Sequence, residues 1–156
     1  MNPSPKRQSG FTLIEVLISL VVMSTGLLAV GLMQAKGIVS AGDAFQRTQA
    51  TWLAYEMLDR MRANPNNLTG YLDKKVGYNQ IPVTDPGTVT MASQRTTKDL
   101  YEWQNNLSAV AGRTGLYQAI GSISKIAGLY KVQIQWQGGS KQSGVETRKV
   151  WVETDI

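Results

Sequence analysis

Hydrophobic residues follow three different patterns along the chain, and the first of them is a long continuous run. Residues 11–33 are almost entirely apolar and contain one charged residue, Glu15, in 23 positions. A helix of that length spans about 34 Å, which exceeds the roughly 30 Å hydrocarbon core of a bilayer. We therefore expect a membrane-spanning helix over this segment.

The second pattern is a stripe of apolar residues at steps of three and four over residues 34–63. It predicts that the helix continues as an amphipathic half packed against a folded head. Asn64-Pro65 should end it, because the residue before a proline avoids helical geometry. Asp59 and Arg62 are spaced to pair on its surface. The stripe consists of Phe45, Trp52, Leu53, Met57, Leu58 and Met61.

The third pattern is the alternation of apolar and polar residues in the last part of the chain. Residues 64–156 predict a small head, which begins with an aperiodic segment, 66–97, expected to be a loop with one short strand. Steps of three and four then predict a helix over 99–111. The alternation then predicts three antiparallel strands, over 116–126, 130–136 and 145–153. A long helix followed by such a sheet is an α+β arrangement.

The amino-acid composition excludes most kinds of catalytic chemistry. The chain contains neither cysteine nor histidine. Disulfides and thiolate sites are therefore excluded, and the usual general base and the commonest zinc ligand are missing. No pair of a nucleophile and a base stands out among the remaining side chains. We expect no enzymatic activity, no catalytic residue, no cofactor and no metal site.

The positive charge is partly a property of the N-terminal segment. The formal charge is +5, and Lys6 and Arg7 lie in the polar segment 1–10. Without that segment the charge falls to +3, which favours solubility over nucleic-acid binding. By the positive-inside rule, these two residues place the N-terminus in the cytoplasm and the head outside. The apolar run is too long for an ordinary secretory signal.

Glu15 needs a physical reason, because a charge in a membrane helix costs roughly 2.5–3.5 kcal/mol on insertion scales. It either stays solvated at the membrane interface or pairs with a cation in an assembled state. A new amino terminus at Phe11 would supply that cation in the same apolar surroundings. Such a pair between neighbouring subunits would set their axial register.

A short motif follows the basic segment and combines a glycine, an aromatic residue and the isolated glutamate at the start of the apolar run. It reads Gly10-Phe11-Thr12-Leu13-Ile14-Glu15-Val16. It resembles the prepilin signal shared by type IV pilins and type II secretion pseudopilins. The resemblance implies a leader, 1–10, that the prepilin peptidase cleaves between Gly10 and Phe11. It also implies methylation of the new N-terminus at Phe11, a membrane and filament-core helix over 11–33, and an assembly role for Glu15.

The soluble part resembles minor pilins of the PilV type. The matching segments are Ala54 to Pro65, Asp99-Leu100-x-x-Trp103 and Val132-x-Ile134-x-Trp136. The resemblance implies the pilin fold, a long N-terminal helix on a small antiparallel sheet, and a place in a tip complex that primes pilus assembly for twitching motility and adhesion. Implied partners are minor pilins of the FimU, PilW and PilX types, a PilY-type tip protein, the major pilin, the prepilin peptidase and the inner membrane. The implied location is the inner membrane, then the pilus tip.

Two alternatives stay open. One is a minor pseudopilin of type II secretion, of the GspI type, because it shares the N-terminal motif. The other is a head that binds DNA or a surface, although we favour a solvated sheet face and do not expect nucleic acid as a partner. The residues considered for such binding are Lys125, Lys131, Lys141, Arg148 and Lys149, near Tyr130 and Trp151.

Overall fold

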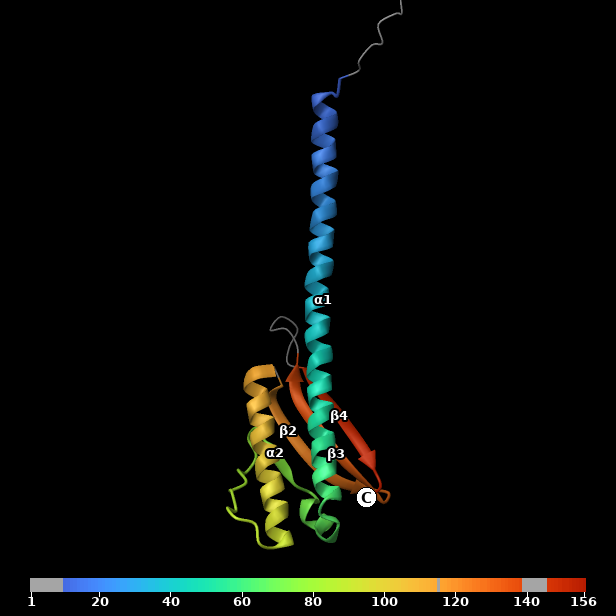
Figure 1. Cartoon of the computed structure of the whole chain (residues 1–156). Helices are drawn as coiled ribbons and strands as arrows, with labels where there is room; N and C mark the ends of the chain where they lie inside the picture. The colour runs from blue at the N-terminus through green and yellow to red at the C-terminus, as the bar shows by residue number, and fades with distance from the viewer. Residues whose placement is uncertain (1–9, 115, 139–145) are drawn as a thin grey trace, which may run out of the picture. The chain divides into compact units, whose positions relative to one another are not determined.

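The chain forms two compact units, Met1–Ala41 and Gly42–Ile156. The structure is a computed structural model and describes residues 10–114, 116–138 and 146–156. The first helix, α1 (Leu13–Arg62), has residues in both units (Figure 1). It ends two residues before Asn64, so the stop predicted at Asn64-Pro65 is confirmed.

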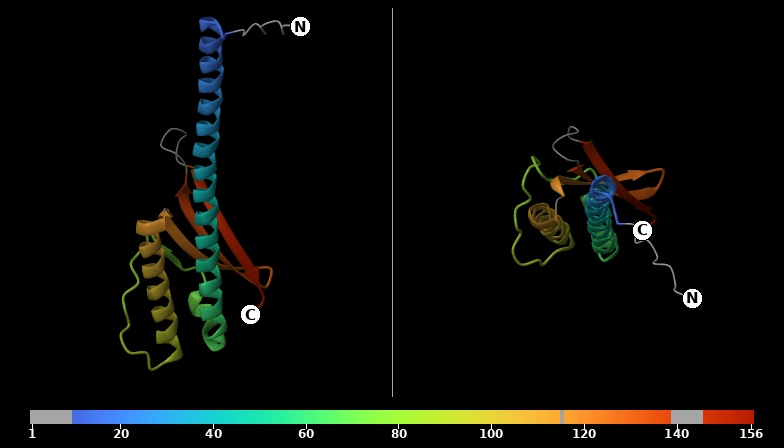
Figure 2. Two further views of the ribbon diagram at one scale, coloured as in Figure 1. Left: turned by 45° about the horizontal axis from the view of Figure 1, so that its top comes forward. Right: turned by 90° about the horizontal axis from the view of Figure 1, so that it is seen from above.

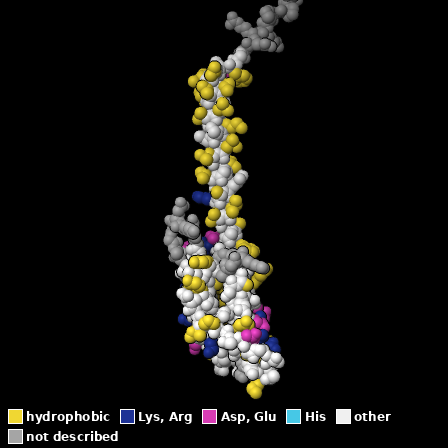
Figure 3. Space-filling model, turned by 90° about the vertical axis from the view of Figure 1, so that its left-hand side faces the viewer, with side chains coloured by type: hydrophobic (Ala, Val, Ile, Leu, Met, Phe, Trp, Pro, Cys, Tyr) yellow, Lys and Arg dark blue, Asp and Glu magenta, His cyan; other side chains and the backbone are white. Residues whose placement is uncertain are grey.

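In the first unit, every described side chain is exposed, although most are apolar. Phe11 is 85% exposed, Leu20 58% and Met33 75%. In Figure 3, hydrophobic side chains cover this segment in the upper part of the view. Among the described residues, α1 is the one helix long and apolar enough to cross a membrane. So much apolar surface is unfavourable in water, so this part of the helix requires lipid or another protein around it.

The second unit combines two helices with a four-stranded antiparallel sheet, so the predicted α+β fold is confirmed. Residues 42–62 of α1 and the second helix, α2 (Ala92–Thr114), lie side by side on one face of the sheet (Figure 2). A short 3-10 helix, η1 (Pro65–Tyr71), follows α1. The strands neighbour one another in chain order: β1 (Lys75–Gly77), β2 (Tyr117–Ile126), β3 (Leu129–Gly138) and β4 (Glu146–Thr154).

The core fills the space between the sheet and the two helices. Strand β3 alternates as predicted and buries Tyr130, Val132, Ile134 and Trp136. From α2, the core receives Leu100, Trp103 and Leu107. From α1, it receives Ala50, Leu53, Ala54, Met57, Leu58 and Met61.

The predicted stripe on α1 is wrong at two positions. Phe45 is 51% exposed and Trp52 is 67% exposed, so neither packs in the core. The buried face of the helix instead includes Ala50 and Ala54, which are fully buried. Small residues let the helix approach the sheet closely. A pattern weighted by side-chain hydrophobicity favours the large aromatics and overlooks these alanines.

The segment between η1 and α2 contains the one short strand that was predicted, β1. The second helix begins at Ala92, however, seven residues before the predicted start at residue 99. The Gln94 side chain explains this early start. Its Oε1 atom accepts hydrogen bonds from the backbone N–H groups of Thr90, at 2.9 Å, and Met91, at 3.1 Å. These donors at a helix start otherwise have no backbone partner.

Candidate assembly site

The residues predicted for processing lie at the start of α1. Gly10 and Phe11 are exposed and precede the helix. Thr12 caps it, because the backbone N–H of Glu15 donates to the Thr12 carbonyl at 3.1 Å and lies 3.4 Å from the Thr12 hydroxyl. Thr12-x-x-Glu15 has the spacing of a capping box, a sequence signal that the hydrophobic pattern alone does not reveal. The Gly10–Phe11 peptide bond therefore lies in exposed, non-helical chain.

A groove of about 340 Å³ brings Phe11 and Glu15 together on one side of the helix. Its other lining residues are apolar, except for Ser19, whose hydroxyl donates to the Glu15 carbonyl at 2.7 Å. Within the described residues, the Glu15 carboxylate has no hydrogen bond and no ion pair. An unpaired carboxylate in an apolar groove suits a cation from another molecule. The leader residues Lys6 and Arg7 lie outside the described residues.

A second unpartnered surface lies on α1 within the second unit. Phe45, Trp52 and Tyr55 are 51%, 67% and 48% exposed. They are separated by seven and three residues, which is the spacing of a seam between two helices. We call these three residues the aromatic stripe. Clustered exposed aromatics mark protein interaction surfaces, so the aromatic stripe is a candidate contact for another subunit.

Asp59 and Arg62 continue this seam toward the C-terminal end of α1, at steps of four and three residues after Tyr55. The Arg62 guanidinium lies 2.9 Å from the Asp59 carboxylate, so the predicted pair is confirmed. Both side chains are well exposed, and the pair contributes at most about 0.5 kcal/mol.

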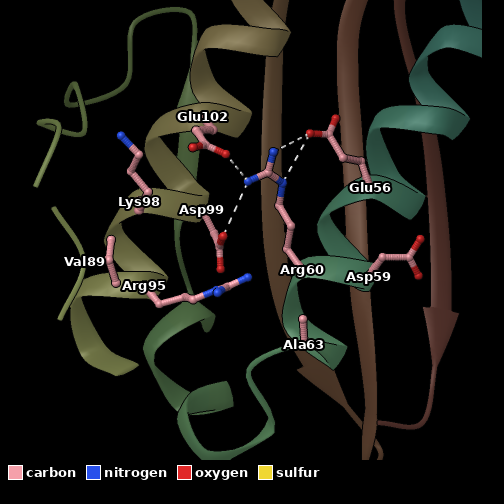
Figure 4. A pocket seen from close by; sticks show the side chains of 9 residues that line it. All are labelled: Glu56, Asp59, Arg60, Ala63, Val89, Arg95, Lys98, Asp99 and Glu102. Atoms are coloured by element: carbon pink, nitrogen blue, oxygen red, sulfur yellow. Dashed lines mark hydrogen bonds and ion pairs between the residues drawn. The ribbon is translucent and has the colours of Figure 1, made fainter. Parts of the chain in front are cut away.

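A charged cluster joins the two helices of the head (Figure 4). Arg60 on α1 donates to Glu56 at 2.8 Å and to Glu102 on α2 at 2.5 Å, and it lies 3.4 Å from Asp99. Burial opposes the charge of Arg60, but its hydrogen bonds to Glu102 and Glu56 outweigh burial and raise its pKa. The cluster borders a hollow of about 580 Å³. Its carboxylates already share the Arg60 cation, and no group of three or more His, Cys, Asp or Glu side chains among the described residues is arranged to hold a metal ion.

Tyr71 connects this cluster to Asn64, a buried residue just after the end of α1. Its hydroxyl donates to Asp99 at 2.5 Å and accepts a hydrogen bond from the Asn64 amide at 3.1 Å. Tyr71 is fully buried. Burial, and then the Asp99 carboxylate, raise the pKa of Tyr71 to about 12. The arrangement supports a structural role, because the hydroxyl satisfies a buried carboxylate that would otherwise rely on Arg60 alone.

Replacing Tyr71 with phenylalanine is expected to lower the free energy of unfolding by about 1.5–3 kcal/mol, because a buried carboxylate loses a hydrogen bond. The wild type should also lose stability above pH 10. Unfolded tyrosine ionises near pH 10 and folded Tyr71 near pH 12, so the contribution is complete below pH 10 and lost as the pH rises through 12. Urea unfolding at pH 7 and at pH 10–12 measures both effects.

Tyr117→Phe is the matched control, because Tyr117 is 59% exposed and its hydroxyl has no hydrogen bond within the described residues. This variant should unfold within about 0.5 kcal/mol of the wild type. The difference between Tyr71→Phe and the wild type should shrink between pH 10 and pH 12. A difference that stays constant there would refute the assigned pKa.

Two residues considered for DNA binding lie on the inner face of the sheet. Arg148 pairs with Asp43 of α1, and the hydrogen bond from Arg148 lowers the pKa of Asp43. Tyr130 is 5% exposed, so its ring is not available for stacking on a base. The ion pair and the burial explain why these residues do not form a basic aromatic surface.

Of the other candidate cations, Lys131 is partly neutralised, whereas Lys149 is exposed and has no ion pair within the described residues. Lys131 lies 3.0 Å from Glu153 and 5.0 Å from the centre of the Trp151 ring. Lys125 lies over the ring of Tyr130. Lys141 lies outside the described residues. These contacts favour a solvated sheet face over a phosphate-binding surface.

Two protein-family models match the chain. Residues 5–31 match the prokaryotic N-terminal methylation motif, which together with the long apolar part of α1 fits a membrane-anchored protein. Residues 32–99 match the family described as type IV pilin Tt1218. The two matches are contiguous and together cover more than half of the chain, which therefore belongs to the type IV pilins. No curated protein and no solved structure matches it.

Membership of this family gives the exposed surfaces a context. Pilins are structural proteins that associate with other pilins and with the pilus machinery. A membrane-anchored pilin fits both the methylation motif and the apolar part of α1. Association with other subunits also gives the unpaired Glu15 carboxylate and the aromatic stripe a reason to be exposed.

Proposed function

We propose that the chain is a minor pilin of the PilV type, which joins other minor pilins in a tip complex that primes type IV pilus assembly. The observation that carries the role in assembly is the groove that combines Phe11 with the unpaired Glu15 carboxylate on a fully exposed apolar helix. Such a helix is unsuited to water and suited to lipid, and then to the interior of a filament.

Processing would complete the site. The prepilin peptidase, in this proposal, cuts between Gly10 and Phe11, and the new amino terminus at Phe11 is methylated. That amino group is a cation next to an apolar ring. Pairing it with the Glu15 carboxylate of a neighbouring subunit would neutralise both charges in an apolar environment, where an unpaired charge is costly. The pair would also fix the axial position of one subunit on the next.

The proposal divides the chain by role. Residues 1–10 are the leader, 11–33 the membrane and filament-core helix, 34–63 its amphipathic continuation, and 64–156 the rest of the head. The N-terminus lies in the cytoplasm and the head in the periplasm, and the subunit later reaches the pilus tip. The aromatic stripe then contacts a helix of another minor pilin, of the FimU, PilW or PilX type, below a PilY-type tip protein.

Deleting the gene tests the role in pilus assembly. We expect at least a tenfold loss of surface pili and of twitching, with normal levels of the major pilin, because a priming complex limits initiation and not pilin synthesis. Electron microscopy of surface pili and immunoblots of whole cells measure both. Re-expression of the wild-type chain is the control.

The same strain distinguishes the alternative role in type II secretion. A GspI-type pseudopilin would leave piliation normal and block the release of secreted enzymes into the medium. Normal piliation together with a secretion defect would therefore replace the proposed function with this alternative. Normal piliation and normal secretion would refute both roles.

A further inference from the structure

A second hollow in the head is lined by uncharged hydrogen-bonding side chains. Its volume is about 420 Å³, within the range of about 300–1,000 Å³ that is usual for small-molecule pockets. Its lining residues come from the segment directly after β1, from β2 and β3, and from the start of β4. None of its lining residues carries a charge. The polar side chains are those of Tyr78, Asn79, Gln118, Gln135, Gln137 and Thr147.

A β-bulge builds one wall of this pocket. Strand β2 has an extra residue between Tyr117 and Ile120 relative to β3. Gln118, inside the bulge, has a φ of 54°, in the left-handed region that glutamine rarely adopts. Bulges change the direction in which a side chain points. This one places Gln118 at the same hollow as Gln135 and Gln137 of β3.

The end of β1 lies directly beside this bulge. Gly77 has a φ of 115°, and a Cβ atom there would overlap the Ala119 carbonyl, so only glycine allows this approach. The backbone N–H of Tyr78 then donates to the Ala119 carbonyl at 2.9 Å. These contacts hold Tyr78 and Asn79 at the pocket. The Tyr78 side chain is 46% exposed, which leaves part of its ring free for a ligand.

The polar groups of the pocket are free to bind. Within the described residues, none of the six polar side chains makes a hydrogen bond to another protein group. Gln118, Gln135 and Gln137 are half-buried residues, and the amide of each offers two donors and an acceptor. No described protein group satisfies these amides, so they remain available to water or to a ligand.

We propose that this pocket binds a neutral saccharide. Each sugar hydroxyl both donates and accepts hydrogen bonds, and clustered amides provide both functions. A pocket without charge offers nothing to offset the desolvation of an anionic or cationic ligand. An extended peptide fits less well, because peptides bind sheets at a free edge, whereas the facing backbone groups of β2 and β3 pair with each other. This site does not depend on the proposed role in assembly.

Saturation-transfer difference NMR on the full chain tests the proposal. The chain is held in a zwitterionic detergent, because a glycoside detergent would itself present a sugar. The probes are glucose, galactose and N-acetylglucosamine, with acyclic sorbitol and a short uncharged peptide as controls. We expect saturable binding of at least one sugar with half-saturation at roughly 1 mM, typical of a ligand of this size in a pre-formed pocket.

Two glutamines of β3 supply a matched pair of variants. Gln135 lines the pocket, whereas Gln133 lies on the same strand and the same face but outside it. Gln135→Ala should weaken sugar binding about tenfold, and Gln133→Ala should change it less than twofold. Gln118→Ala removes a pocket amide from β2 and should weaken sugar binding to a similar extent. Near-UV circular dichroism checks that each variant is folded.

Three results would overturn the saccharide site. The first is the absence of saturable binding by any of the three sugars up to roughly 50 mM, far above the expected half-saturation. The second is an equal loss of binding in Gln133→Ala and Gln135→Ala. The third is binding of sorbitol or the peptide as tightly as the best sugar. None of these results bears on piliation, so the saccharide site and the assembly role can fail separately.

Discussion

Replacing Trp103 with alanine is expected to lower the free energy of unfolding of the head by about 3–5 kcal/mol. The indole is fully buried between the helices and the sheet, and its Nε1 donates to the Leu53 carbonyl of α1 at 2.9 Å. Truncation leaves a cavity and removes a hydrogen bond between α2 and α1, made by two residues that are 50 positions apart in the chain. Since small domains are stable by only about 5–15 kcal/mol, the loss is a large fraction of the total.

Trp52→Ala provides the control with the same chemical change. Trp52 is also on a helix but is 67% exposed, so its removal should alter the free energy of unfolding by less than about 0.5 kcal/mol. Urea unfolding of each full-length variant, followed by near-UV circular dichroism, measures the difference. Equal losses in the two variants would mean that Trp103 is not the centre of the core.

A substitution that adds volume next to Trp103, instead of removing it, gives an independent check. The Trp103 ring lies where a Cβ atom on Gly121 of β2 would be. Gly121→Val should therefore force the indole aside and destabilise the head by about 1–3 kcal/mol or more. Because the ring and the glycine share one contact, the effects of Trp103→Ala and Gly121→Val should not add in the double variant. Strict additivity would contradict the contact.

The second large effect is expected at Glu15. Glu15→Gln keeps the shape of the side chain and the capping spacing with Thr12 but removes the charge. If the carboxylate pairs with the amino terminus of a neighbour, this change leaves an unpaired cation in an apolar filament, at a cost of about 3–5 kcal/mol. Incorporation into pili should then fall by about two orders of magnitude or more, and Glu15→Val should behave in the same way.

Immunoblots of sheared surface pili and of membranes measure incorporation and insertion separately. Both the variant and the wild type should insert in the membrane, and mass spectrometry should find that each begins at a methylated Phe11. Ser19→Ala, in the same groove, is the control and should assemble normally. Wild-type incorporation of Glu15→Gln would remove the charge pair from the mechanism, and a mature chain that begins elsewhere would refute the processing site.

Much of the fold can be predicted from local patterns. The alternation along β3 and the proline after Asn64 depend on the period of a strand and on the geometry of one residue, and the structure follows both. The errors occur where packing decides. Phe45 and Trp52 have the hydrophobicity of core residues, but the helix turns the small Ala50 and Ala54 toward the sheet. The early start of α2 depends on one side chain, Gln94, which no periodicity reveals.

The candidate sites also differ in whether the sequence alone reveals them. The motif from Gly10 to Glu15 is local, so sequence alone identifies its candidate processing and assembly residues. The cluster of Arg60, Asp99 and Tyr71 joins residues from three elements, and nothing in the spacing of the chain predicts it. The amide-lined pocket needs a bulge, a glycine that permits close approach, and glutamines from neighbouring strands, which also makes it invisible in the sequence.

For this protein, the sequence by itself determined the apolar helix, the pilin-type N-terminus and the α+β order of elements, because each follows from residues close together in the chain. The tertiary structure alone decided which aromatic residues stay exposed and which charges find partners. Those outcomes depend on how α1 is rotated about its axis against the sheet, as with Ala54 facing the core and Tyr55 facing outward. Rotation is fixed by the packing of distant side chains, so no local pattern contains it.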